Sequence, residues 1–186
     1  MQLFESTIAV ETSDAFHMGR LLLLIDVFSG ADQDGSVQGV TKLAKLDFLL
    51  RYPGNLERAL TAKGVNRDLA AVKDYERQNV ESAMVRFRYG PWDFRYRRFL
   101  NLLVSKGLID LWVSGRTLHI RATARGSQIA ASLAGTEDFQ EIHRRGRLLK
   151  THFDIGGTAL MKFIYAVFPE LKTLRFGVPI NEIQAQ

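Results

Sequence analysis

The sequence predicts a mainly α-helical protein that carries one small β-hairpin, an α+β fold. Most apolar residues recur with the three-to-four-residue spacing of amphipathic helices. Segment 109–122 instead alternates apolar and polar residues on both sides of a turn at Ser114-Gly115, which is typical of a hairpin. The 186 residues, 46% of them hydrophobic, are enough for one well-buried core with an appendage.

The first part of the chain is predicted to be helical. Ser13 can cap a helix that buries one broad apolar stripe. A second helix is predicted over 40–51, and the Pro-Gly pair at 53–54 separates it from a shorter helix that Asn55 can cap. Residues 63–80 are polar and predict a loop or a weak helix.

The middle of the chain, 82–133, predicts a winged-helix unit. A short strand ends at a break formed by Gly90-Pro91 and is followed by an amphipathic recognition helix that stops at Gly107. The hairpin forms the wing, and Thr123 stands where the closing helix needs its N-cap. The predicted buried sides of the two helices consist of Tyr96, Phe99, Leu100 and Leu103 in the first, and of Ile129, Ala130 and Leu133 in the second.

The last part of the chain predicts two helices and an extended tail. Gly156-Gly157 separates a helix over 136–153 from a very apolar helix over 158–168, which implies burial against the body or another chain. The tail alternates apolar and polar residues over 174–180, so it can add a strand to a sheet edge in this chain or in a partner. The candidate partner interface consists of Ile164, Tyr165, Phe168 and Phe176.

Two consecutive regions are therefore expected. Residues 1–135 form a winged-helix domain with N-terminal helices, and residues 136–186 form a C-terminal helical interaction segment with an extended tail.

Positive charge is concentrated in the winged-helix segment. The chain has a net charge of +5, but residues 82–125 hold nine basic residues against two acids. A recognition helix presents side chains to the major groove while a wing touches the backbone, so this segment predicts a nucleic-acid contact. The alternatives are solvated arginines beside Asp93 or a basic surface for an acidic protein partner. The candidate nucleic-acid-binding residues are Arg95, Arg98, Asn101 and Arg116.

Two other motifs have simpler explanations. The aromatic residues between 87 and 99 could stack on single-stranded bases, but core packing is the preferred interpretation because Tyr96 and Phe99 share the helix's apolar stripe. The sequence FDIGGTA at 153–159 resembles the phosphate loop of sugar kinases and actin-like ATPases. A charged helical pattern precedes it here, so the glycines are interpreted as a helix breaker with Thr158 as a cap.

No catalytic or metal centre is predicted. The chain has no cysteine, its four histidines lack paired ligand spacing, and neither a G-x-S-x-G nor a Walker A motif is present. We expect no enzyme activity, no cofactor, no metal and no small-molecule substrate. The acidic N-terminus is unlike a signal peptide, and the longest apolar run, 21–25, is far shorter than the ~20 residues that span a bilayer. A cytoplasmic protein without membrane contact is expected.

Several segments together resemble the small middle components of bacterial ABC-three-component anti-phage systems, of which the Lamassu systems are the nearest parallel. They are VRFRYGPWDFRYRRFLNLLVSKGLI (85–109), the T-x-x-G at 123–126, GGTALMKFIYAVFPEL (156–171) and LRFGVPI (174–180). KLDFLLRYPGNLERAL (45–60) adds to the match, so the resemblance covers most of the chain past residue 40.

This resemblance implies a non-catalytic winged-helix subunit that accompanies an SMC-like ATPase and an effector nuclease. Such a subunit would help to hold the effector inactive until the ATPase senses foreign DNA. The residues alone leave a second function open, a dimeric winged-helix transcription regulator that places Arg95, Arg98 and Arg116 on an operator.

Overall fold

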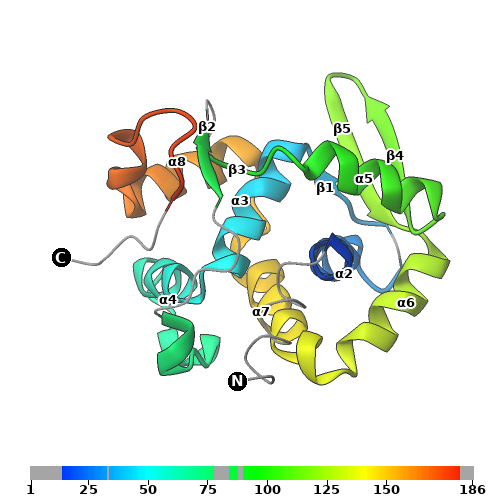
Figure 1. Cartoon of the computed structure of the whole chain (residues 1–186), viewed down its shortest axis with the longest axis horizontal. Helices are drawn as coiled ribbons and strands as arrows, with labels where there is room; N and C mark the ends of the chain where they lie inside the picture. Colours follow the sequence, from blue (N-terminus) through cyan, green and yellow to red (C-terminus); the bar gives the residue numbers. More distant parts are fainter. Residues whose placement is uncertain (1–13, 33, 78–83, 88–89, 181–186) are drawn as a thin grey trace. The chain divides into compact units, whose positions relative to one another are not determined.

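The computed structural model describes residues 14–32, 34–77, 84–87 and 90–180. Within these residues the chain is mainly helical and carries a small antiparallel sheet, so the predicted α+β class is confirmed (Figure 1). None of the helices in the described part of the chain is both long and apolar enough to cross a membrane. The predicted cap Ser13 lies outside the described residues.

The chain divides into two compact units, and each is built from two separate stretches of sequence. Unit 1 contains residues 1–37 and 94–146, and unit 2 contains residues 38–93 and 147–186. This division differs from the single boundary expected after residue 135. The units alternate along the chain because the segment between the first strand and the predicted recognition helix packs with the C-terminal helices.

Unit 1 is built around a central helix, α2 (Asp14–Ser29), whose residues 21–25 are fully buried. A helix that is apolar on all sides must be covered all round. Accordingly, α2 packs against two helices and a strand of its own unit, α5, α6 and β5 (Figure 1). The other elements are β1 (Val37–Gln38), α5 (Tyr96–Ser105), β4 (Ile109–Ser114), β5 (Thr117–Ala122), α6 (Ala124–Ala134) and the first part of α7 (Glu137–Phe153).

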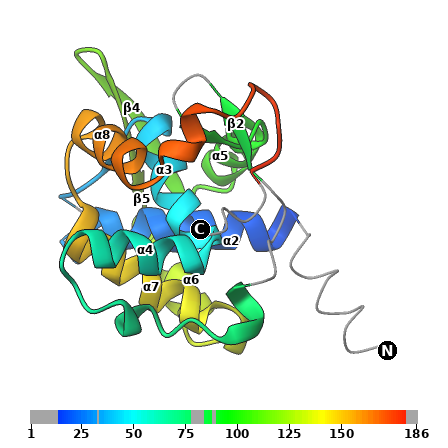
Figure 2. The same cartoon turned by 90° about the vertical axis from the view of Figure 1, so that its left-hand side faces the viewer.

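The sheet of unit 1 has the strand order β1-β5-β4. The predicted hairpin is confirmed, with β4 and β5 antiparallel from the pair Ile109↔Ala122 to the pair Ser114↔Thr117. Gly115 has a φ of 60° at the first position of the two-residue loop, a conformation that favours glycine. The hairpin therefore places residue 116 at its tip, and it projects away from the helices of its unit (Figure 2).

The closing helix α6 begins as the sequence predicts. The Thr123 hydroxyl accepts a hydrogen bond from the Gly126 backbone N–H at 2.9 Å and thus caps the helix. Ala130 is buried and Leu133 is half-buried, but Ile129 is 41% exposed, so its predicted inward orientation is wrong. The buried side of α6 is centred on residues 126, 130 and 133, and position 129 lies at its margin in the helical period.

Unit 2 also has a central helix, α3 (Val40–Arg51), with the predicted bounds. α3 packs against two helices and a strand of unit 2, α4, α8 and β3. Residues 63–77 form turns with two short 3-10 segments, in agreement with the predicted loop. The elements around α3 are α4 (Pro53–Ala62), η1 (Arg67–Ala70), η2 (Asp74–Arg77), β2 (Val85–Phe87), β3 (Gly90–Trp92), the second part of α7, α8 (Gly157–Val167) and η3 (Pro169–Lys172).

Two local predictions in unit 2 are wrong. Helix α4 begins at Pro53 and not at an Asn55 cap, because proline at the first helical position is preorganised and needs no N–H partner. Asn55 lies inside the first turn and is buried. The predicted short strand is β2, which ends at Phe87, but Gly90-Pro91 is not a break: it belongs to β3, which pairs with β2 in antiparallel register. Proline is tolerated there because β3 is an edge strand.

The predicted tail strand over 174–180 forms only in part: residues 177–180 pair with residues 84–86 of this chain, with a single bridge between Val85 and Pro179, and residues 174–176 form no strand. The paired segment runs beside β2 (Figure 2) and exchanges backbone hydrogen bonds with it, from the Arg86 N–H to the Val178 carbonyl at 3.0 Å and from the Ile180 N–H to the Met84 carbonyl at 2.7 Å. The Tyr52 hydroxyl accepts from the Met84 N–H and donates to the Ile180 carbonyl, both at 2.9 Å. Burial raises the pKa of Tyr52 to about 12, so the hydroxyl remains a donor that joins strand and tail.

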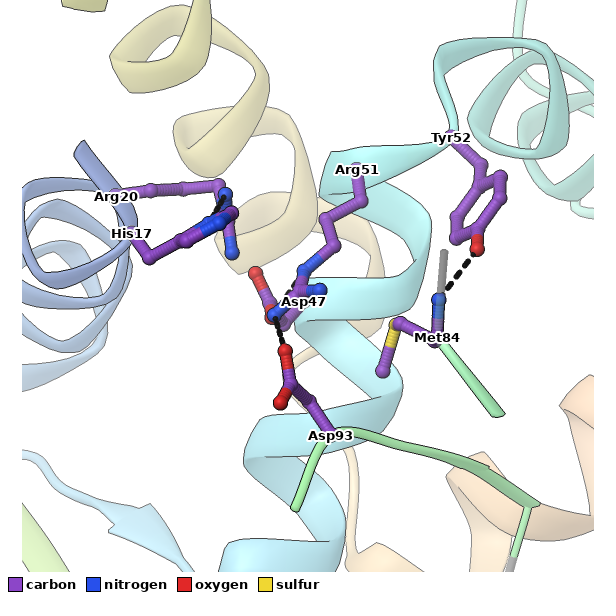
Figure 3. A network of polar contacts seen from close by, with 7 residues as sticks. All are labelled: His17, Arg20, Asp47, Arg51, Tyr52, Met84 and Asp93. Atoms are coloured by element: carbon purple, nitrogen blue, oxygen red, sulfur yellow. Dashed lines mark hydrogen bonds and ion pairs between the residues drawn. The ribbon is translucent and has the colours of Figure 1, made fainter. Parts of the chain in front are cut away.

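A buried ionic cluster joins α3 to the end of β3 in unit 2 (Figure 3). Arg51 donates from Nε to Asp47 at 2.9 Å and from Nη2 to Asp93 at 2.8 Å. The side chains of Arg51 and Asp47 are 0% exposed, and that of Asp93 is 7% exposed. Asp93 is therefore a buried partner of Arg51.

Candidate nucleic-acid interface

Helix α5 presents a basic surface because its opposite side is buried in unit 1. The predicted inward residues Tyr96, Phe99, Leu100 and Leu103 are all at most 3% exposed. Because an α-helix has 3.6 residues per turn, residues that are not on the buried side of α5 lie on its opposite side, which faces solvent. That exposed side consists of Arg97, Arg98, Asn101, Val104 and Ser105.

The three candidate residues predicted on α5 differ in solvent exposure and in their contacts. Arg98 and Asn101 are exposed, as predicted. Arg95 precedes the helix as its N-cap residue, is only half exposed, and holds its guanidinium 5.3 Å from the centre of the Phe99 ring. Arg98 forms an ion pair with Asp14 in the first turn of α2. Arg98 and Asn101 are thus better placed than Arg95 to meet a ligand.

Arg97 is an exposed arginine that the sequence analysis did not select. It lies four residues before Asn101, and this spacing places both side chains on the same side of α5. The helical period could have identified it. We define the α5–hairpin face as Arg97, Arg98 and Asn101 of α5 together with Arg116 at the hairpin tip.

The hairpin that carries Arg116 is stiffened by a ladder of side chains on one of its sides. Trp112 and His119, directly opposite each other, stack with ring centroids 5.0 Å apart. The Arg121 guanidinium lies 4.9 Å from the centre of the Trp112 ring, and Ser36 beside β1 bonds His119 Nδ1 at 2.8 Å. Such cross-strand pairs stabilise a hairpin, and this hairpin contacts α5 through β4.

The aromatic residues considered as a stacking platform do not gather on one surface. Tyr96 and Phe99 are buried, in line with the core interpretation, whereas Phe94 is 64% exposed. Trp92 belongs to unit 2, and the side chains of Phe87 and Tyr89 lie outside the described residues. A continuous platform for bases is therefore not observed among the described aromatic residues.

Of the four candidate partner-interface residues, two are buried within the chain. Ile164 is 1% exposed and Phe168 is 0% exposed, so neither offers surface to a partner. Phe168 packs edge-to-face on Phe48 at 5.5 Å, because α8 uses its apolar stripe against α3 and α4. Tyr165 is half-buried, with the Lys172 ammonium 5.7 Å from its ring centre. Phe176 is 62% exposed and remains a candidate interface residue.

The FDIGGTA segment has the structural role expected of a helix breaker. Gly156 is the N-cap of α8, which begins at Gly157, and the expected side-chain cap from Thr158 is not formed. Burial alone would raise the pKa of Asp154, but hydrogen bonds from Lys150 at 2.6 Å and Lys42 at 2.9 Å lower the pKa below its usual range. These lysines hold Asp154 in an ion-pair cluster of unit 2.

The exposed arginines of the α5–hairpin face carry groups that can bind phosphate. Nowhere in the described ranges do three or more His, Asp or Glu side chains gather as they would around a metal ion. Arginine guanidinium groups stay charged and donate in a fixed fork that matches phosphate. No protein-family model, curated protein or solved structure matches this chain.

Proposed function

We propose that this chain is a non-catalytic winged-helix subunit that contacts duplex DNA through its α5–hairpin face, within an assembly that contains an SMC-like ATPase and an effector nuclease. The observation that carries the proposal is the exposed basic helix α5 beside a stiffened hairpin with Arg116 at its tip. The assembly partners are inferred from the resemblance of the sequence to ABC-three-component middle components.

The topology of unit 1 supports the winged-helix interpretation. In sequence order, a first helix precedes a short strand, and a second helix is followed by a hairpin and a closing helix. The short strand β1 pairs with β5, the second strand of the hairpin, and leaves β4 at the edge. In a winged helix the helix before the hairpin enters the major groove, and here that helix is α5.

Binding of duplex DNA can be tested with single-arginine variants of the full chain. Arg97→Ala and Arg116→Ala should each lower the slope of log affinity against log salt by about 0.9, because each removes one phosphate contact. Near 0.1 M salt this corresponds to about eightfold weaker binding for each variant. The measurement is fluorescence anisotropy with a random-sequence 30-base-pair duplex, repeated over a range of salt concentrations.

A matched control for these variants is Arg147→Ala, which removes an exposed arginine of unit 2. Its salt slope should equal that of the unmodified chain. An equal loss in Arg147→Ala would show that only total charge matters and would contradict a defined interface. Salt-independent binding, or no binding to any duplex, would refute the DNA contact.

Membership of an assembly can be tested by co-expression with the products of neighbouring genes. The chain should elute in gel filtration together with a large coiled-coil ATPase, and elution as a free monomer would refute the proposal. Phe176→Ser should weaken this association if the tail is part of the interface. Tyr75→Ser is the control, because Tyr75 is also an exposed aromatic residue of unit 2 with a cation near its ring.

One feature of α5 favours the alternative function, a dimeric transcription regulator. Arginine and asparagine are the side chains that read guanine and adenine in the major groove, and Arg98 and Asn101 are adjacent on the exposed side of α5. Competition experiments separate the two functions. A regulator would prefer one operator sequence over random DNA by at least about a thousandfold, whereas the assembly subunit would show little preference.

A further inference from the structure

An acidic residue of unit 1 is already bound to the proposed DNA-binding face. Asp14, in the first turn of α2, forms an ion pair with Arg98 of α5. The two side chains remain 37% and 62% exposed, so the pair lies at the surface. The other two arginines of the face, Arg97 and Arg116, have no ion-pair partner within the described part of the chain.

We infer that Asp14 limits the affinity of the face for DNA by competing with phosphate for the Arg98 guanidinium. This inference rests on the proposed function. Asp14 Oδ2 contacts Arg98 Nη2, and a phosphate bound to both arms of the planar fork needs that same nitrogen, so Arg98 must release Asp14 before it can bind phosphate in this way. An exposed ion pair is weak enough for such an exchange to occur.

The position of Asp14 in a helix keeps its carboxylate close to Arg98. A residue in the first turn of α2 is held near its partner by the backbone of a helix that packs against α5. An acidic residue is also favourable at this position, because it complements the positive end of the helix dipole. The negative charge of the Asp14 carboxylate would in addition repel a phosphate that lies within the screening length, about 10 Å at 0.1 M salt.

The test is Asp14→Asn in the full chain, measured with the same random-sequence duplex. We expect roughly three- to tenfold tighter binding near 0.1 M salt, with a salt slope steeper by up to about 0.9, since one more phosphate contact forms without competition. In an Arg98→Ala background, Asp14→Asn should have no effect, because the guanidinium for which carboxylate and phosphate compete is gone.

The matched control is Asp138→Asn. Asp138 is an exposed first-turn acid of α7 in the same unit, so its replacement changes the net charge and the helix end in the same way. Its DNA affinity should stay within about twofold of that of the unmodified chain. Thermal unfolding of both variants, followed by circular dichroism, should show equal and small losses of stability.

The outcomes separate this inference from the proposed function. If the unmodified chain binds DNA with strong salt dependence and Asp14→Asn binds no better than Asp138→Asn, the inference is wrong and the proposed function stands. If the gain from Asp14→Asn persists without Arg98, the effect is one of general charge and the competition is refuted. If no variant binds DNA, both ideas fail.

Discussion

Replacing Arg51 by methionine should lower the free energy of unfolding by about 3–5 kcal/mol. The change leaves the carboxylates of Asp47 and Asp93 buried without the cation that both contact. Breaking a buried ion pair by removing one partner is this costly because the remaining buried charge loses a counterion. Urea unfolding followed by circular dichroism measures the loss, which should be smaller at acidic pH, where protonation removes the charges.

The control for Arg51 is the half-exposed ion pair of the same unit. Arg58 contacts Glu170 with side chains 34% and 29% exposed, and Arg58→Met should lose no more than about 1 kcal/mol. The triple change Asp47→Asn, Arg51→Met and Asp93→Asn should recover part of the stability, since it also removes the two buried carboxylate charges that Arg51 contacts. If Arg51→Met and Arg58→Met lose the same amount, the buried cluster is not the anchor inferred from its geometry.

Replacing Gly126 by alanine should lower the free energy of unfolding by about 3 kcal/mol. In most helix interiors this change is stabilising, because alanine has the higher helix propensity. At Gly126 a Cβ atom would lie only 1.9 Å from the Leu108 carbonyl oxygen, a backbone atom that cannot move aside alone. The overpacking must separate α6 from the chain that precedes the hairpin, and such forced shifts are costly.

Gly146 provides a matched comparison inside another helix, α7. A Cβ atom there would meet Val27 Cγ2 at 3.8 Å, an ordinary van der Waals contact. Gly146→Ala should therefore raise the free energy of unfolding by about 0.5–1 kcal/mol. The opposite signs of the two changes are the expected result. A stabilising Gly126→Ala would contradict the close approach of α6 to Leu108.

Much of the local structure was predictable because its signals lie within a few residues. Helix α3 has the predicted bounds, α5 buries the predicted stripe, and Thr123 caps α6. Asn55 was misassigned as a cap because proline at position 53 already satisfies the start of α4. The pairing of Gly90-Pro91 in β3 depends on strand β2, which local turn propensity does not reveal.

The candidate interface was predictable only in part, because exposure depends on packing between distant segments. Charge and spacing identified Arg98, Asn101 and Arg116, but the side of α5 that is buried decides between Arg95 and Arg97. The apolar sequence of α8 was correctly expected to be buried in part. It could not show that Ile164 and Phe168 are covered within the chain itself. The pairing of Asp14 with Arg98 joins residues 84 positions apart and had no sequence signal.

The alternation of the two units along the chain has a consequence for biosynthesis. During translation, the first stretch of unit 1 leaves the ribosome first. Residues 38–93, which belong to unit 2, are synthesised before the second stretch of unit 1. The apolar surface of helix α2 therefore stays uncovered until α5, the hairpin and α6 have been synthesised. Unit 2 in turn lacks the tail segment that pairs with β2 until residue 180 emerges. A nascent chain of this protein should thus need protection by chaperones for most of its synthesis.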